Sequence, residues 1–215
     1  MSFPLHGLYA VTPDNPSCAA LAAVLEGGCR LIQYRDKNID APTRNQRARA
    51  FLTLCRQHNA KLLINDDWRL AAEIGADGAH LGRGDGTLRE ARSALGDAAI
   101  LGATCYQSLE LARRAEDDGA SYAAFGAAWP SPTKPEAPLA TLALYEAAAR
   151  TLSIPVCAIG GITLANVRPL LESGVSLIAL VSDLFSAPDI AAQTRAHIRF
   201  FEEFRHAAPQ QPSPF

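Results

Sequence analysis

The sequence predicts a single-domain α/β protein with a (β/α)8 TIM-barrel fold, and three observations lead to this class. Short, mostly apolar runs alternate along the 215 residues with longer Ala/Leu/Arg-rich stretches of helical period. Eight such βα pairs can be counted, the number that closes a barrel of parallel strands. Glycines stand between several predicted helices and the strands that follow them, where a left-handed residue often ends a helix.

The eight predicted strands are brief and apolar, as expected for a parallel sheet that is covered on both faces. In chain order they span residues 8–11, 31–34, 62–64, 78–81, 100–103, 122–125, 156–159 and 177–181. Barrel enzymes place their catalytic groups at the carboxyl ends of the strands. The residues that follow each strand are therefore where a functional site is expected.

The eight predicted helices occupy the longer stretches between the strands. They span residues 17–26, 43–57, 68–74, 88–95, 109–117, 139–151, 164–172 and 189–204. Glycines at Gly27-Gly28, Gly75, Gly119 and Gly174 mark the return from a helix to the next strand. The barrel domain is placed at residues 1–206, and the Pro/Gln-rich residues 207–215 are predicted to form a flexible tail.

The composition limits which binding partners and which cellular compartment are expected. The formal net charge is -2, so no broad positive field favours nucleic acid or an anionic membrane, and any anion site must be local. No apolar stretch approaches the roughly 20 residues that span a bilayer. The five cysteines are odd in number and widely spaced, which favours a reducing compartment over a disulfide framework or zinc site. A cytoplasmic protein is expected, and its state as monomer or homodimer stays open.

Two cations and an amide follow the second predicted strand. Gln33, Arg35 and Lys37 alternate with other residues, so they project to one side of an extended chain. Such a cluster can bind an anion. The alternative is a solvated basic rim without a ligand.

Acidic oxygens follow the third and fourth predicted strands. Asn65 and Asp66 come directly after one strand, and Asp85 follows the next. Mg²⁺ prefers such hard ligands and takes only one or two carboxylates from a protein, so Asp66 and Asp85 are predicted to bind Mg²⁺. Alternatively, Asn65 or Asp67 caps the next helix while Asp85 makes a glycine-flanked turn.

Three later strand ends offer groups suited to phosphate. Ser131, Thr133 and Lys134 lie in a proline-stiffened loop after the sixth strand, which could instead be a plain surface turn. Gly160-Gly161 follows the seventh strand and Val181-Ser182 follows the eighth. In such barrels, the last two loops commonly bind phosphate through backbone N–H groups.

Taken in order, these motifs resemble those of the thiamine phosphate synthase family, from about residue 8 to residue 185. The motifs are Gln33-x-Arg35-x-Lys37, Asn65-Asp66, Gly82-x-x-Asp85, Ser131-x-Thr133-Lys134, Gly160-Gly161-Ile162 and Val181-Ser182. The resemblance implies an enzyme that joins 4-amino-2-methyl-5-hydroxymethylpyrimidine diphosphate to 4-methyl-5-(2-phosphoethyl)thiazole, or its 2-carboxy form. The products would be thiamine phosphate and pyrophosphate.

The resemblance also implies a role for each matching residue. The pyrimidine diphosphate would be held by Gln33, Arg35, Lys37, Asn65, Thr104 and Lys134, of which Arg35, Lys37 and Lys134 would be catalytic. The metal ligands would be Asp66 and Asp85. The thiazole phosphate would be held by Ser131, Thr133, Gly161, Val181 and Ser182.

The chain departs from the family pattern at a few places. Arg83 stands where the family usually has Gln, and residues 102–106 replace a Gly-Val-Ser-x-His segment, with Thr104 at the serine position. Two other classes stay open: an isomerase similar to the thiazole tautomerase relatives of the family, and a non-catalytic phosphate-binding module. The cations and carboxylates of the predicted diphosphate site argue against the isomerase.

Overall fold

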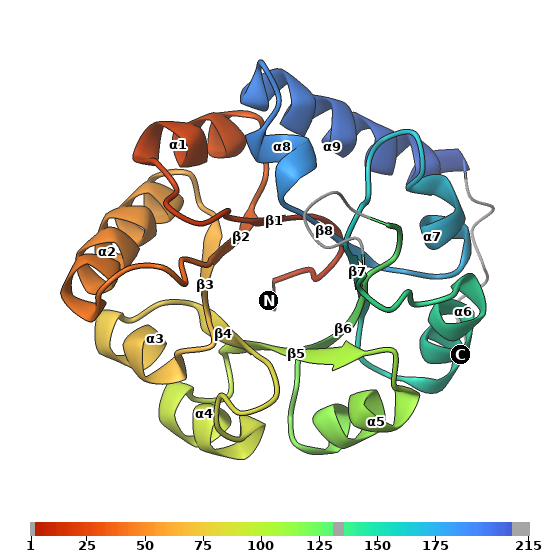
Figure 1. The fold of residues 1–215 in the computed structure, drawn as a ribbon, viewed down its shortest axis with the longest axis horizontal. Helices are drawn as coiled ribbons and strands as arrows, with labels where there is room; N and C mark the ends of the chain where they lie inside the picture. Colours follow the sequence, from red (N-terminus) through yellow and green to blue (C-terminus); the bar gives the residue numbers. More distant parts are fainter. Residues whose placement is uncertain (1–2, 131–135, 208–215) are drawn as a thin grey trace.

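The computed structural model describes residues 3–130 and 136–207 and contains a closed barrel of eight parallel strands. Each strand pairs with the next in the sequence, and β8 pairs with β1. Figure 1 looks into the ring of strands, which the helices surround. The strands are β1 (Gly7–Val11), β2 (Leu31–Tyr34), β3 (Lys61–Asn65), β4 (Gly78–Leu81), β5 (Ile100–Tyr106), β6 (Tyr122–Gly126), β7 (Val156–Ile159) and β8 (Leu177–Leu180). The predicted fold class is confirmed.

The helices cover the outside of the barrel. They are α1 (Cys18–Glu26), α2 (Ala41–Gln57), α3 (Trp68–Ile74), α4 (Leu88–Leu95), α5 (Leu109–Asp117), α6 (Leu142–Thr151), α7 (Arg168–Glu172), α8 (Ser182–Phe185) and α9 (Ile190–Ala207). Among the described residues, no helix is both long and apolar enough to cross a membrane. The predicted tail falls almost wholly on residues 208–215, which lie outside the described residues.

The side chains of each strand alternate between two apolar layers. On β3, Leu62 and Ile64 join the layer between strands and helices, whereas Leu63 joins the layer inside the barrel. Phe3 and Leu5, which precede β1, pack against the interior layer, and Figure 1 shows this segment inside the ring of strands. The barrel is thus filled with side chains and is not an open channel.

The main differences from the predicted helices are the late starts of α6 and α7 and the additional helix α8. Helix α6 begins at Leu142 because the Thr141 side chain accepts a hydrogen bond from the Leu144 N–H and caps it there. Helix α7 begins only at Arg168, because the Asn166 side chain accepts from the Thr163 N–H and holds the preceding loop in another conformation. The four-residue α8 is too short to give a periodic pattern in the sequence.

Candidate active site

The polar strand ends of β2 and β3 meet around a cavity. The cavity has a volume of about 250 Å³, and Lys37, Asn65 and Asp66 are among the residues that line it. A second cavity, of about 300 Å³, lies near the start of β1 and β2, at the opposite end of the strands. Lys37, Asn65 and Asp66 line the first cavity, and none of the predicted site residues that the structure describes lines the second, so the candidate site lies at the carboxyl end of the strands.

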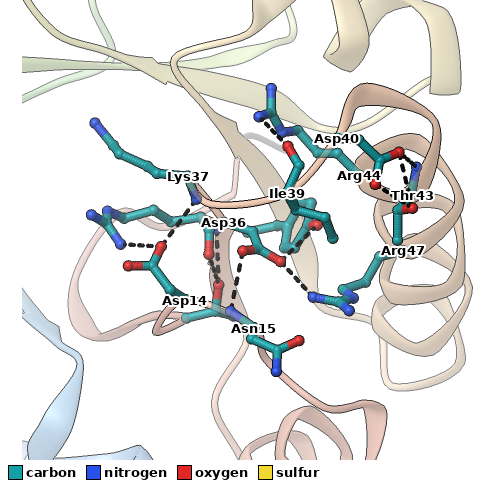
Figure 2. A network of polar contacts seen from close by, with 12 residues as sticks. Asp14, Asn15, Asp36, Lys37, Ile39, Asp40, Thr43, Arg44 and Arg47 are labelled. Carbon is teal, nitrogen blue, oxygen red and sulfur yellow. Dashed lines mark hydrogen bonds and ion pairs between the residues drawn. The ribbon is translucent and has the colours of Figure 1, made fainter.

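The loop after β2 is held by two residues that follow β1. Thr12 Oγ1 donates to the Arg35 carbonyl over 2.8 Å and accepts from the Arg35 N–H over 2.9 Å. One Asp14 carboxylate oxygen accepts from the Lys37 N–H and from the Arg35 guanidinium, over 3.0 and 2.9 Å. The Lys37 N–H, and then the Arg35 charge, lower the pKa of Asp14. Figure 2 shows this network.

Asp36 lies on the other side of the same loop. Its side chain is buried and accepts from Arg47 over 2.5 Å and from the Asn15 N–H over 3.1 Å. In Figure 2, Asp36 points toward Arg47 and Lys37 points away from it. Asp36 therefore anchors the loop to α2, and the predicted alternation leaves Lys37 facing the cavity.

Lys37 joins the ends of β2 and β3. Its ammonium lies 3.0 Å from a carboxylate oxygen of Asp66. Asp66 has a left-handed backbone, with φ 65°, a conformation that Asp tolerates better than most residues. Such backbone strain is common at functional sites. The following residue, Asp67, caps α3 by accepting from the Leu70 N–H, so the capping alternative holds for Asp67 and leaves Asp66 free for another role.

Asp85 lies beside Asp66 at the end of β4. Its carboxylate accepts from the Gly82 N–H over 2.7 Å, so the predicted turn exists and also orients the side chain. Burial and the nearby Asp66 charge raise the pKa of Asp85. Two carboxylates that repel each other fit a divalent cation, and their number suits Mg²⁺. No cluster of three or more His, Cys, Asp or Glu side chains suited to a metal occurs within residues 3–130 and 136–207.

A chain of hydrogen bonds crosses the barrel interior beneath these residues. The Gln33 amide nitrogen donates to the Tyr9 hydroxyl over 2.5 Å, and the Tyr9 and Tyr122 hydroxyls lie 2.7 Å apart. His80 contacts Tyr122 with Nδ1 and Thr104 with Nε2, each over 2.8 Å. Gln33 and Thr104, both predicted to bind the pyrimidine diphosphate, are thus connected through side chains that sequence reasoning left out.

The loop after β7 packs against the start of the loop after β6. The Trp129 N–H donates to the Gly160 carbonyl over 3.0 Å, and a Cβ on Gly161 would lie 2.5 Å from the Trp129 carbonyl oxygen. Gly161 also has φ 66°. Both facts require glycine. The Asn166 amide donates to the Gly161 carbonyl over 2.9 Å and so fixes the loop.

The remaining predicted residues fall into two groups. Val181 and Ser182 lie where β8 passes into α8, beside the β7 strand to which β8 is paired. Ser131, Thr133 and Lys134 lie outside the described residues. The residue before this group, Pro130, has its carbonyl oxygen 2.7 Å from a Cβ built on Gly161, so Pro130 lies next to the Gly160-Gly161 loop.

Comparison with known proteins identifies the family. A model of the family described as thiamine monophosphate synthase matches residues 8–184. The chain belongs to this family. It is 51% identical over 203 residues to the thiamine-phosphate synthase of Thioalkalivibrio sulfidiphilus, covering 92% of this chain and 96% of the relative. It is 50% identical to that of Thiobacillus denitrificans, covering 88% and 91%. The structure of the thiamine phosphate pyrophosphorylase from Pyrococcus furiosus superposes with a TM-score of 0.84 at 31% identity, covering 93% and 97%.

Membership of the thiamine monophosphate synthase family makes the chain a transferase that acts on small phosphorylated pyrimidine and thiazole substrates. Two departures from the family motifs lie next to each other. The Arg83 guanidinium lies 5.4 Å from the centre of the Tyr106 ring, within the range of a cation–π contact. Tyr106 follows an irregularity in the β5–β6 pairing and has φ 54°. The two substitutions therefore form one pair at the rim.

Several residues that shape this site were not predicted from the sequence. Thr12 and Asp14 follow β1, so the strand-end rule that identified Arg35 applies to them as well. The spacing of Thr163 and Asn166 is that of a side-chain cap. His80 alternates with Ala79 and Leu81 of the outer apolar layer, and the period of two places it inside the barrel.

The pH dependence of stability tests the burial of His80. Burial lowers the pKa of His80 from 6.5 to about 4, although Asp66 opposes the shift. Below pH 6.5, His80 binds a proton in the unfolded chain but stays neutral in the folded protein. The free energy of unfolding therefore decreases as the pH falls toward 4. We expect His80 to lower the free energy of unfolding by about 2 kcal/mol between pH 7 and pH 5. Urea unfolding of wild type and His80→Gln at both pH values measures it, and equal losses in the two proteins would contradict the expectation.

Proposed function

We propose that the chain joins 4-amino-2-methyl-5-hydroxymethylpyrimidine diphosphate to 4-methyl-5-(2-phosphoethyl)thiazole, or its 2-carboxy form, and releases pyrophosphate, together with CO2 when the 2-carboxy form reacts. The observation that carries the proposal is that the Lys37–Asp66 pair, with Asp85 beside it, shares one end of the barrel with the Gly160-Gly161 loop. One half-site suits a diphosphate and the other a phosphate. The bond to be made then lies between them, over the barrel mouth.

The diphosphate half-site combines cations with hydrogen-bond donors. We assign it to Gln33, Arg35, Lys37, Asn65, Thr104 and Lys134. Asp66 and Asp85 would hold Mg²⁺, which when bound neutralises diphosphate oxygens and so favours their departure. Asp14 orients Arg35, because its carboxylate binds both the guanidinium and the loop backbone. The Gln33 amide nitrogen is committed to Tyr9, which leaves the amide oxygen to accept from the pyrimidine.

The thiazole phosphate would lie at the late loops, held by Ser131, Thr133, Gly161, Val181 and Ser182. The absence of a Cβ at Gly161 lets backbone N–H groups approach a phosphate closely. Asn166 keeps this loop in place through its bond to the Gly161 carbonyl. The thiazole nitrogen would then face the pyrimidine methylene.

The proposed reaction needs no enzymic nucleophile. The bond between the methylene carbon and the diphosphate oxygen breaks, and the electron pair leaves with pyrophosphate. The amino-pyrimidine ring donates electrons to the methylene cation, and the thiazole nitrogen then forms the new C–N bond. Arg35, Lys37 and Lys134 stabilise the charge on the leaving group. One preorganised contact of this kind contributes roughly 3 kcal/mol in a transition state.

Five free cysteines support a cytoplasmic location, which we propose along with the activity. All five lie within the described residues, and Cys29, Cys55, Cys105 and Cys157 are buried. Disulfides are typical of oxidising compartments, and an unpaired set of thiols fits a reducing one.

Incubation of the protein with both substrates and Mg²⁺ tests the proposed function. Thiamine phosphate and pyrophosphate are expected in equal amounts, and chelation of the metal is expected to stop their formation. Conversion of the thiazole substrate alone into an isomer would instead identify a tautomerase. Binding of the thiazole phosphate without any product would identify a non-catalytic module.

A further inference from the structure

The hydrogen-bond chain inside the barrel has two different ends. It runs from the Gln33 amide through the hydroxyls of Tyr9 and Tyr122 to the His80 ring, and from there to Thr104. Tyr9 and Tyr122 are 1% and 0% exposed, so water does not compete for their hydroxyls. Each residue comes from a different strand, and the closed barrel brings them together.

The Gln33 amide determines which group donates in the first two hydrogen bonds of this chain. The Gln33 nitrogen is a donor without acceptor capacity, so the Tyr9 oxygen accepts there. The Tyr9 hydroxyl then donates its own hydrogen bond to the Tyr122 oxygen, 2.7 Å away. Burial raises the pKa of both phenols, so each keeps its single hydrogen. The hydrogen of Tyr122 is therefore left for its other neighbour, His80 Nδ1.

This direction decides the form of the His80 ring. Because Nδ1 accepts from Tyr122, the ring carries its hydrogen on Nε2. The Nε2–H then donates to the Thr104 oxygen over 2.8 Å. Thr104 receives a hydrogen bond through its oxygen, and its own hydroxyl hydrogen remains available to another acceptor.

The Thr104 hydroxyl lies next to the proposed diphosphate site. A Cβ built on Gly82 would be 3.8 Å from Thr104 Oγ1 and 3.2 Å from a carboxylate oxygen of Asp85. The ring of His80 is held in place by stacking on Tyr122, with a centroid distance of 5.6 Å. Gly102 leaves room for this pair, because a Cβ there would lie 2.2 Å from the Tyr122 oxygen and 2.4 Å from His80 Nδ1.

We propose that His80 is a positioning residue that holds the Thr104 hydroxyl as a hydrogen-bond donor toward the substrate diphosphate. It acts through Thr104 and does not touch the substrate. The proposal rests on the proposed function, because the acceptor is the diphosphate of that site. With the opposite ring tautomer, the Thr104 hydrogen would point to His80 and only lone pairs would face the anion.

The ring tautomer can be observed directly in the wild-type protein. Histidine labelled with ¹⁵N gives different nitrogen shifts for the two tautomers in a long-range ¹H–¹⁵N correlation spectrum, and loss of one signal set in His80→Phe assigns the residue. The expected result is a protonated Nε2 and an unprotonated Nδ1 at neutral pH. A protonated Nδ1, or an average of the two forms, would overturn the proposal.

A double-mutant cycle tests whether His80 acts through Thr104. Calorimetry with Mg²⁺ and inorganic pyrophosphate compares wild type, His80→Phe, Thr104→Val and the double variant. Phenylalanine keeps a ring beside Tyr122, and valine keeps the shape of threonine. We expect each single change to lower the affinity for pyrophosphate about tenfold, and we expect the double variant to bind pyrophosphate as Thr104→Val does. If the double variant instead loses affinity by the product of the two single losses, His80 has only a structural role.

The two proposals fail in different ways. Wild-type protein that does not bind pyrophosphate with Mg²⁺ would contradict the diphosphate site itself. Wild-type binding together with multiplied losses, or with a protonated Nδ1, would contradict the role of His80 alone. If His80→Phe does not fold, loss of one signal set in His80→Gln assigns the residue, and the spectrum of the wild type still decides the tautomer.

Discussion

Asp66→Asn is expected to lower the rate of thiamine phosphate formation by about 100-fold or more. The substitution keeps the shape of the side chain but removes the charge that faces Lys37 and, in the proposed site, a ligand of Mg²⁺. Loss of one preorganised electrostatic contact accounts for about 3 kcal/mol, or roughly two powers of ten in rate. Steady-state assays over a range of Mg²⁺ concentrations measure the effect.

The neighbouring Asp67 provides a matched control. Asp67→Asn makes the same change in charge one residue away, at a side chain that caps α3 through the Leu70 N–H. Asparagine caps a helix as well as aspartate does, so activity and stability should stay close to wild type. Asn also tolerates the left-handed backbone of residue 66, so Asp66→Asn should fold. Equal activity of the two variants would contradict the role of Asp66.

Gly102→Ala is expected to destabilise the barrel by at least about 3 kcal/mol. The added Cβ would lie 2.2 Å from both Cζ and the hydroxyl oxygen of Tyr122, and 2.4 Å from His80 Nδ1. Both side chains are hydrogen-bonded inside the barrel and cannot move without breaking those bonds. Urea unfolding measures the loss, which would appear as a low yield of folded protein if the barrel does not tolerate it.

Gly75→Ala separates crowding from the general effect of replacing a glycine. Gly75 ends α3 with φ 69°, and the nearest atom to an added Cβ is an Arg56 nitrogen at 3.8 Å. Its substitution should cost only about 1 to 2 kcal/mol, from the left-handed backbone alone. A smaller loss for Gly102→Ala than for Gly75→Ala would show that the barrel interior is not packed as described.

The fold was predictable because its pattern repeats eight times. The bounds of β2, β4 and β7 agree with the predicted ones, since each is a short, mostly apolar run that ends at a polar residue or a glycine. Strand β5 runs on to Tyr106, beyond the predicted end at residue 103, because it continues past an irregularity in its pairing with β6. Pairing between strands decides such ends, and a single segment of sequence does not contain it.

The candidate site was predictable where its groups follow directly on a strand. Lys37, Asp66 and Asp85 come together because three neighbouring strands end at one rim. Asp14 was missed because its role depends on contact with the loop after the next strand. His80 was not predicted as a site residue, because its hydrogen bonds to Thr104 on β5 and Tyr122 on β6 depend on how the strands pair and not on its own segment of sequence.

The proposed activity depends on a metal and diphosphate site at the ends of β2 to β5. A crystal of the protein grown with Mn²⁺ and inorganic pyrophosphate tests this most directly, because the anomalous signal locates the metal. We expect the peak between the carboxylates of Asp66 and Asp85, with pyrophosphate oxygens completing its shell and reaching Lys37 and Arg35. A metal peak elsewhere on the protein, with pyrophosphate away from these residues, would contradict the account.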